Sequence, residues 1–226
     1  MEKANSLQPQ KTSRILVTTG VIVMILLSLT QLVPALKLAG YSVFVGIAFF
    51  FIVEAVAKTP KGQSGLRFKT FWSDMKKPGV LLWVLLPVVT AVVPLLLDRW
   101  FLKMDFAAHV VGRTDGMLSF ENTFMLIVQV VILAWGEEIA WRGFFVGKTM
   151  GRYPFWLCAV VSSVLFACGH ISDGPIGLLL YDLSFVFIDS LIFSVIYRKS
   201  GNCLVSTVSH IIGNAVGLAA TFLMMA

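Results

Sequence analysis

The chain has 226 residues, of which 58% are apolar and only 13% are charged, with a mean hydropathy of +0.86. This composition excludes an ordinary soluble domain and is typical of a protein that crosses a membrane several times. The formal charge of +6 does not indicate a nucleic-acid partner, because the basic residues lie in short segments between apolar runs rather than on one basic face.

Seven apolar segments are candidates for membrane spans, each of which needs roughly 20 helical residues. In chain order they are residues 15–36, 41–57, 79–97, 121–147, 154–171, 175–197 and 203–225. We therefore predict an all-α, polytopic transmembrane helical bundle that forms a single membrane domain over residues 1–226. An eighth span within 98–120 is the alternative, but it would break the charge pattern of the loops.

Basic residues alternate between the two sides of this predicted bundle. With the N-terminus in the cytoplasm, thirteen of them lie on the inner side and four on the outer side, as the positive-inside rule requires. The inner residues are Lys3, Lys11, Arg14, Lys58, Lys61, Arg67, Lys69, Lys76, Lys77, Lys148, Arg152, Arg198 and Lys199. The outer residues are Lys37, Arg99, Lys103 and Arg113.

The segment between the second and third spans has an amphipathic pattern. Phe68, Phe71, Trp72 and Met75 recur at helical spacing among basic residues, which predicts an interfacial helix near 66–77 on the inner leaflet. We divide the chain into N-terminal spans with this helix, over 1–118, and a four-helix core over 119–226.

Two adjacent glutamates lie inside the fourth predicted span. A carboxylate in hydrocarbon costs about 3 kcal/mol or more, so each needs a partner or a wet surface. Glu138 and Arg142 are four residues apart on one helix face and can form a buried ion pair. Glu137 points about 100° away from that face and has no such partner on its helix. It is either a protonated group bonded to another helix or a functional carboxylate.

Three further polar residues lie at compatible depths in the fifth and seventh spans. His170 ends the fifth span, and His210 and Asn214 share one face of the seventh. With a rise of about 1.5 Å per residue, they can meet Glu137 in the inner half to the middle of the membrane, in a water-filled cavity.

Two aspartates and the third histidine complete the polar set. Asp182 and Asp189 are seven residues apart on the sixth span, where they either bond a catalytic histidine or line the cavity. His109 lies in an outer loop and has no obvious role.

The motifs Glu137-Glu138-x-x-x-Arg142, Phe166-x-x-x-His170 and His210-x-x-x-Asn214 occur in this order on predicted spans. Together they resemble the signature of the CAAX-protease and bacteriocin-processing (CPBP or Abi) family of intramembrane proteases. The resemblance covers about residues 120–225, and each motif alone is weak.

The resemblance implies a role for each matching position. Glu137 would be the general base that takes a proton from water, and His170 would help to orient that water. His210 and Asn214 would donate hydrogen bonds to the oxyanion, while Glu138 and Arg142 would hold the site in shape. Residues 119–226 would then be the catalytic core.

A metal is an open alternative, since members of this family are usually labelled metalloproteases. Glu137, His170 and His210 could bind zinc with a fourth position left for water. No separate base would then remain unless Glu138 gave up Arg142, and Asn is a poor zinc ligand. We favour water activation without an essential metal.

The expected function is an intramembrane endopeptidase whose substrate is a membrane-associated peptide or protein, in peptide maturation or bacteriocin self-immunity. The short loops and the lack of an organelle address favour a multi-pass protein of the bacterial cytoplasmic membrane. One alternative is a non-catalytic immunity or scaffold protein. Another is a proton-coupled transporter, against which the sequence shows no internal repeat. The sequence leaves the substrate and the oligomeric state open.

Overall fold

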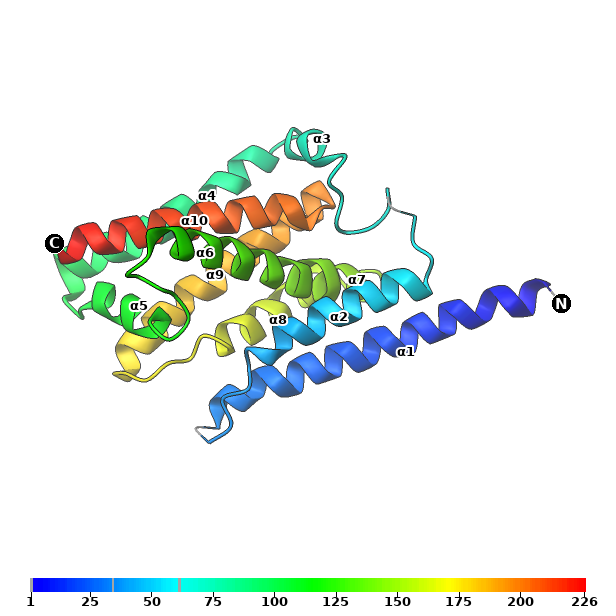
Figure 1. Ribbon diagram of the computed structural model, residues 1–226, viewed down its shortest axis with the longest axis horizontal. Helices are drawn as coiled ribbons and strands as arrows, with labels where there is room; N and C mark the ends of the chain where they lie inside the picture. Colours follow the sequence, from blue (N-terminus) through cyan, green and yellow to red (C-terminus); the bar gives the residue numbers. More distant parts are fainter. Residues whose placement is uncertain (1, 34, 61) are drawn as a thin grey trace.

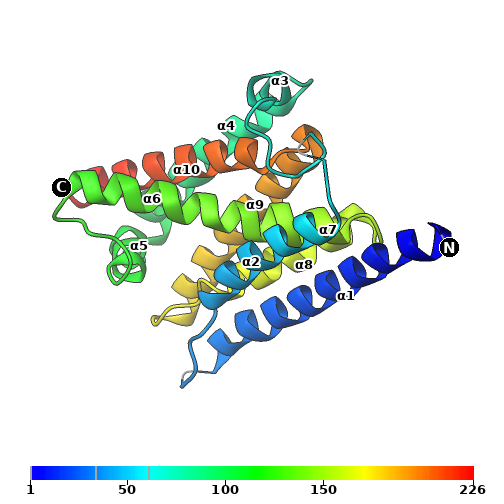
Figure 2. The same ribbon diagram turned by 45° about the vertical axis from the view of Figure 1, so that its right-hand side comes forward.

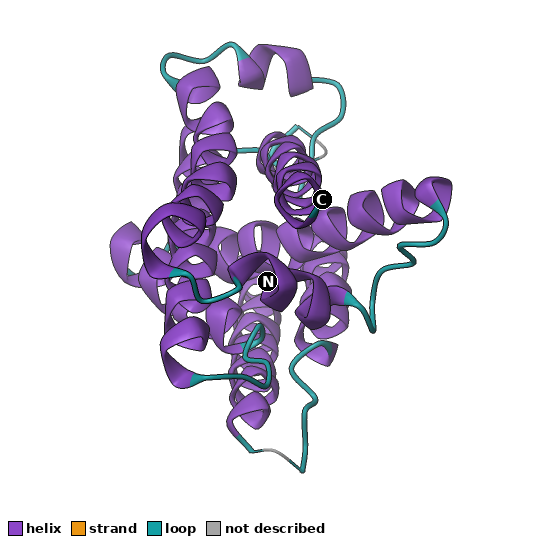
Figure 3. Ribbon diagram, turned by 90° about the vertical axis from the view of Figure 1, so that its left-hand side faces the viewer, coloured by secondary structure: helices purple, strands orange, loops and turns teal. Residues whose placement is uncertain are grey.

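The computed structural model describes residues 2–33, 35–60 and 62–226, and all regular structure in these residues is helical (Figure 3). The α-helices are α1 (Glu2–Leu29), α2 (Tyr41–Val56), α3 (Phe71–Met75), α4 (Val80–Leu97), α5 (Phe106–Thr114), α6 (Thr123–Glu138), α7 (Gly147–Thr149), α8 (Phe155–Cys168), α9 (Ile176–Ser200) and α10 (Cys203–Met225). Three short segments have other helical forms: the 3₁₀ turn η1 (Thr30–Leu32) and the π-helical η2 (Asp98–Leu102) and η3 (Ile139–Val146).

Helices cover all seven segments that the sequence predicts as spans. Five are long and apolar enough to cross a membrane: Lys11–Leu32, Val80–Leu102, Thr123–Thr149, Ile176–Ser200 and Cys203–Met225. The other two, α2 and α8, are apolar but shorter. The segment 98–120 holds α5, whose nine residues extend only about 14 Å and are too short to cross the bilayer.

The long helices run roughly along the longest axis of the molecule, and the two chain termini lie at opposite ends of it (Figure 1). α1 packs along α2, α8 along α9, and α10 lies against both α4 and α6 (Figures 1 and 2). The approach of α10 to α4 is close at Gly213, where an added Cβ would lie 2.9 Å from the Cβ of Pro87. A small residue is needed there for the two backbones to approach.

The centre of the bundle is formed by η3, which continues α6 without a break. All eight residues of η3 are buried, and its aromatic side chains Trp141, Phe144 and Phe145 are part of the largest core cluster. The sequence did not predict the π-helical form of this segment, which directly follows Glu138. π-helical turns inside α-helices are frequent at functional sites.

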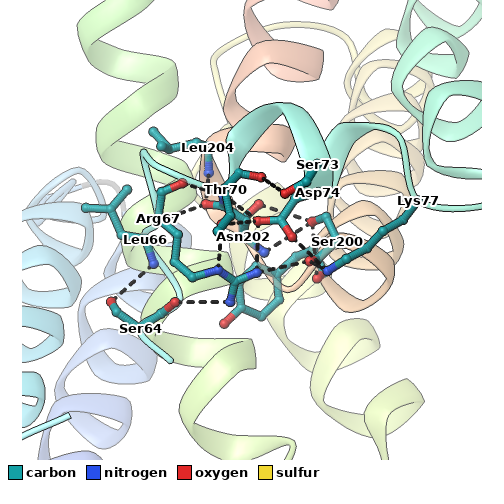
Figure 4. A network of polar contacts seen from close by, with 11 residues as sticks. Ser64, Leu66, Arg67, Thr70, Ser73, Asp74, Lys77, Ser200, Asn202 and Leu204 are labelled. Atoms are coloured by element: carbon teal, nitrogen blue, oxygen red, sulfur yellow. Dashed lines mark hydrogen bonds and ion pairs between the residues drawn. The ribbon is translucent and has the colours of Figure 1, made fainter. Parts of the chain in front are cut away.

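A polar network at the N-terminal end of α10 connects the loop before α4 to α9 and α10 (Figure 4). Asp74 is buried and accepts hydrogen bonds from Thr70 at 2.7 Å, from Arg67 at 3.0 Å and from the side-chain amide of Asn202 at 3.1 Å. Lys77 contacts its other oxygen at 2.8 Å. Asn202 also caps α10 by accepting from a backbone N–H at 3.2 Å, so the network fixes where this helix begins.

The interfacial helix predicted near 66–77 is shorter than expected, since only Phe71–Met75 is helical. The reason is that the backbone of Arg67 bonds across to Asn202: its N–H donates to Oδ1 at 3.1 Å and its carbonyl accepts from Nδ2 at 2.7 Å. The predicted apolar residues remain on the surface, with Phe68 63% and Trp72 72% exposed. Of the basic residues assigned to the inner side, Lys61 and the side chain of Lys3 lie outside the described residues.

We predict that Asp74 makes the stability of the fold sensitive to acid. Burial raises the pKa of its carboxyl, but hydrogen bonds from Lys77, Thr70, Arg67 and Asn202 outweigh it and lower the pKa from 3.8 to about 2. A depressed pKa in the folded state stabilises the protein above pH 4, and this contribution is lost as the pH falls toward 2. It amounts to about 2 kcal/mol at neutral pH.

The measurement is the unfolding midpoint in detergent between pH 2 and pH 7, for the wild type and for Asp74→Asn. The variant should be less stable than the wild type at pH 7, and the difference should shrink below pH 4. Asp115→Asn, which changes an exposed carboxylate, is the matched control and should follow the wild type. A difference between Asp74→Asn and the wild type that is independent of pH contradicts the assignment.

Candidate active site

The Glu138–Arg142 ion pair that the sequence predicts is present and fully buried. Arg142 Nη1 donates to Glu138 Oε1 at 2.8 Å, and neither side chain is exposed to solvent. Arg142 Nη2 reaches α9, where it donates to the backbone carbonyl of Ser190 at 3.0 Å and to its hydroxyl at 2.8 Å. The pair therefore connects the end of α6 to the middle of α9.

Two phenylalanine rings enclose the guanidinium of Arg142. Its central carbon lies 5.0 Å from the ring centroid of Phe166 on α8 and 5.1 Å from that of Phe193 on α9. The Phe193 ring also stacks on His210 of α10, with 4.5 Å between ring centroids and 22° between planes. These contacts bring four helices to one point and hold the imidazole of His210 in a fixed plane.

His210 lies between the two glutamates, which the sequence did not predict. Its Nδ1 is 3.0 Å from Oε1 of Glu138, the same oxygen that receives Arg142. Its Nε2 is 3.7 Å from Oε2 of Glu137. The sequence paired Glu138 with Arg142 alone, because contacts between helices cannot be deduced from spacing along one helix.

Glu137 differs from Glu138 in its surroundings. Its side chain is 22% exposed, whereas that of Glu138 is not exposed at all. The exposed part of Glu137 faces a cavity of about 880 Å³ between the helices. A carboxylate in a membrane that has no close ion pair requires such a wet surface.

All four residues predicted to act in catalysis line this single cavity: Glu137, His170, His210 and Asn214. The predicted structural residues, Glu138 and Arg142, are absent from its lining and lie behind it, bonded to one of its walls. The two groups that the sequence separates by function are thus also separate in space.

His170 and Asn214 present free polar groups to the cavity. His170 follows the end of α8, and its Nδ1 lies 2.8 Å from the carbonyl oxygen of Phe166. A carbonyl can only accept, so Nδ1 carries the hydrogen and Nε2 is left as an acceptor. Asn214 is exposed one turn after His210, and its side chain has no hydrogen-bond partner among the described residues.

The two aspartates of α9 line the cavity but do not bond the predicted catalytic histidines. Asp182 contacts His109 at 3.3 Å and Arg113 at 2.9 Å, and Asp189 accepts a hydrogen bond from Thr90 of α4. Of the two roles that the sequence left open, lining the cavity is the one observed.

The sequence left His109 in the outer loop without an obvious role. It lies on α5 and faces the cavity. The helical spacing of His109 and Arg113 was the signal that could have placed both on one side of a helix.

The candidate metal ligands do not form a metal site in this arrangement. Among the described residues no group of three or more His, Cys, Asp or Glu side chains is placed to hold a metal ion. Both ring nitrogens of His210 lie near a carboxylate oxygen, whereas His170 keeps its Nε2 free. Glu137, His170 and His210 are thus not grouped as the ligands of a zinc site would be.

The comparisons with known proteins identify the domain that carries these residues. Residues 119–216 match the model of a family described as type II CAAX prenyl endopeptidase Rce1-like. No curated protein and no solved structure matches the chain. The matched region includes Glu137, His170, His210 and Asn214, and it confirms the resemblance drawn from the three motifs. Over residues 119–216 the chain thus carries a domain of the Rce1-like family of type II CAAX prenyl endopeptidases.

Proposed function

We propose that this multi-pass membrane protein is an intramembrane endopeptidase that hydrolyses a peptide bond of a membrane-associated peptide or protein. The observation that carries the proposal is that Glu137, His170, His210 and Asn214 line one cavity of about 880 Å³ in the Rce1-like domain. A cavity of this size holds a short stretch of extended peptide together with water.

Glu137 is the base in this proposal. Its Oε2 takes a proton from a water molecule while the water oxygen attacks the carbonyl carbon of the peptide bond. His170 accepts a hydrogen bond from the same water through its free Nε2, which orients the water. Glu137 then passes the proton to the leaving nitrogen as the C–N bond breaks, giving a carboxylic acid and an amine.

His210 and Asn214 stabilise the oxyanion. The amide N–H of Asn214 is unused by the described protein residues, and Nε2 of His210 lies on the Glu137 side of the ring. Because Nδ1 needs its hydrogen to donate to Glu138, a donor at Nε2 requires the imidazolium form. Donors held in place before the reaction need no reorganisation as charge develops.

The proposal needs no metal, because Glu137 takes the proton of the water and His170 orients it. A bound zinc ion would activate water as a Lewis acid, whereas in this proposal Glu137 and His170 activate it.

The biological role that we propose is peptide maturation or bacteriocin self-immunity.

We place the protein in a bacterial cytoplasmic membrane with the N-terminus inside. The support is the charge distribution: the loop between α2 and α4, the α7–α8 connection and the end of α9 carry most of the basic residues. These segments lie at one end of the bundle, where the anionic inner leaflet attracts them.

We predict that Glu137→Gln abolishes cleavage. The variant keeps the shape of the side chain but removes the base, which lowers the rate by a factor of roughly 10² to 10⁴. The measurement compares, by mass spectrometry, the peptides released from membranes that contain the wild type, Glu137→Gln or Glu121→Gln. The last variant makes the same change at an exposed residue outside the cavity and should match the wild type. An unchanged set of products with Glu137→Gln contradicts the protease function and leaves the non-catalytic alternative.

We predict that a chelator leaves cleavage intact. Purified membranes are treated with a strong zinc chelator, washed and assayed for the same released peptides. Cleavage that persists supports activation of water by protein side chains alone. Loss of cleavage that added zinc restores would show an essential metal and would contradict the roles given to Glu137 and His170.

A further inference from the structure

The residues that line the catalytic cavity extend from the middle of the bundle to one of its ends. They include the start of α2, the second half of α4, the end of α8 and the part of α10 from His210 onward, all of which lie away from the basic loops. α5 and the connections before α2 and before α9 complete the lining. These segments meet at the end of the molecule that carries the C-terminus and α5, opposite the N-terminus (Figure 1).

The mouth of the cavity is formed by exposed loop residues at this end. Lys37, between α1 and α2, pairs with Asp173, between α8 and α9, at 3.4 Å. Their side chains are 53% and 97% exposed, and both line the cavity. α5 forms another part of the wall and is held to α9 by the contacts of His109 and Arg113 with Asp182. A polar, solvated mouth is where water and an extended peptide can enter.

The opposite end of the cavity is closed by protein. Between the glutamates and the basic loops lies η3, whose eight residues are all buried. Beyond His210, toward the start of α10, Cys203, Val205 and Ser206 are buried as well. The Asp74 network lies further toward this end, where it joins the start of α10 to the loop before α4 (Figure 4). None of the described residues of the 58–79 and 148–154 segments lines the cavity.

From this geometry we infer that the active site is entered from the side of the membrane opposite the basic loops, which is the extracytoplasmic side. The sequence placed the meeting point in the inner half to the middle of the membrane, and the inference adds the side from which that point is reached. Glu137 is in the middle of its span, twelve residues from Thr149, and the cavity extends from there toward the outer side.

The inference defines the substrate class and rests on the proposed protease function. The substrate is a peptide segment presented at the outer face: an exported peptide, or the outer membrane-proximal segment of a membrane protein. A tail that stays in the cytoplasm cannot reach Glu137 through the closed end. The protein therefore acts after a step that moves its substrate across the membrane.

Four glycines allow a matched test of the side of the membrane from which the cavity is reached. Gly40 and Gly112 line the cavity, whereas Gly62 and Gly151 lie in the loops at the basic end. A Cβ added at any of the four would meet no atom within 4 Å, so each accepts a cysteine without a clash. Of the native cysteines, Cys158 and Cys203 are buried.

The experiment places each new cysteine singly in a Cys168→Ala background, which removes the partly exposed native thiol. A membrane-impermeant maleimide is added to right-side-out and to inverted vesicles of the bacterial expression host. The parent Cys168→Ala protein serves as the unlabelled control. We expect Gly40→Cys and Gly112→Cys to react in right-side-out vesicles, and Gly62→Cys and Gly151→Cys to react only in inverted vesicles.

The reverse pattern, or reaction of all four cysteines from one side, overturns the inference. Labelling reports sidedness whether or not the protein cleaves peptides, so its outcome is independent of the Glu137→Gln test. As a functional readout, a bulky maleimide added from outside should remove cleavage in Gly112→Cys and leave it unchanged in Gly151→Cys. Equal activity of the labelled and unlabelled Gly112→Cys would show that peptides enter by another route.

Discussion

One buried oxygen, Oε1 of Glu138, is the point on which the arrangement of the site depends. It accepts a hydrogen bond from Nη1 of Arg142 at 2.8 Å and lies 3.0 Å from Nδ1 of His210. This one atom therefore links the end of α6 to η3 and α10. A buried carboxylate without partners would cost several kcal/mol in a membrane. The partners of Glu138 are therefore fixed, and so is the ring of His210 that faces the cavity.

The second constraint is the start of α10, which carries both His210 and Asn214. Asn202 caps this helix and is held by Asp74, so the register of α10 is set about two turns before His210. Gly213 against Pro87 then sets its distance from α4. The site is thus positioned by contacts outside the cavity, which leaves the cavity-facing groups of Glu137, His170 and Asn214 free for substrate and water.

Much of the fold and of the site could be predicted from the sequence, because both leave periodic signals. The seven apolar segments are helices, and the spacing of Glu138 and Arg142 predicts the observed ion pair. The features that could not be predicted from the sequence depend on contacts between helices. Nothing in the spacing places His210 beside Glu138, and the Arg67–Asn202 contacts shorten the helix near 66–77 across 135 positions of sequence. The direction in which the cavity opens also needs the packing of α5 and the loops.

The two adjacent carboxylates have separate roles: Glu138 stabilises the fold, and Glu137 is the base that takes a proton from water. The most direct measurement compares the unfolding free energies of Glu138→Gln and Glu137→Gln in one detergent. Glu138→Gln leaves Arg142 buried without a counter-charge and should lose about 3–5 kcal/mol. Glu137→Gln neutralises a cavity-facing group and should stay within about 0.5 kcal/mol of the wild type. Equal losses in the two variants would contradict the division.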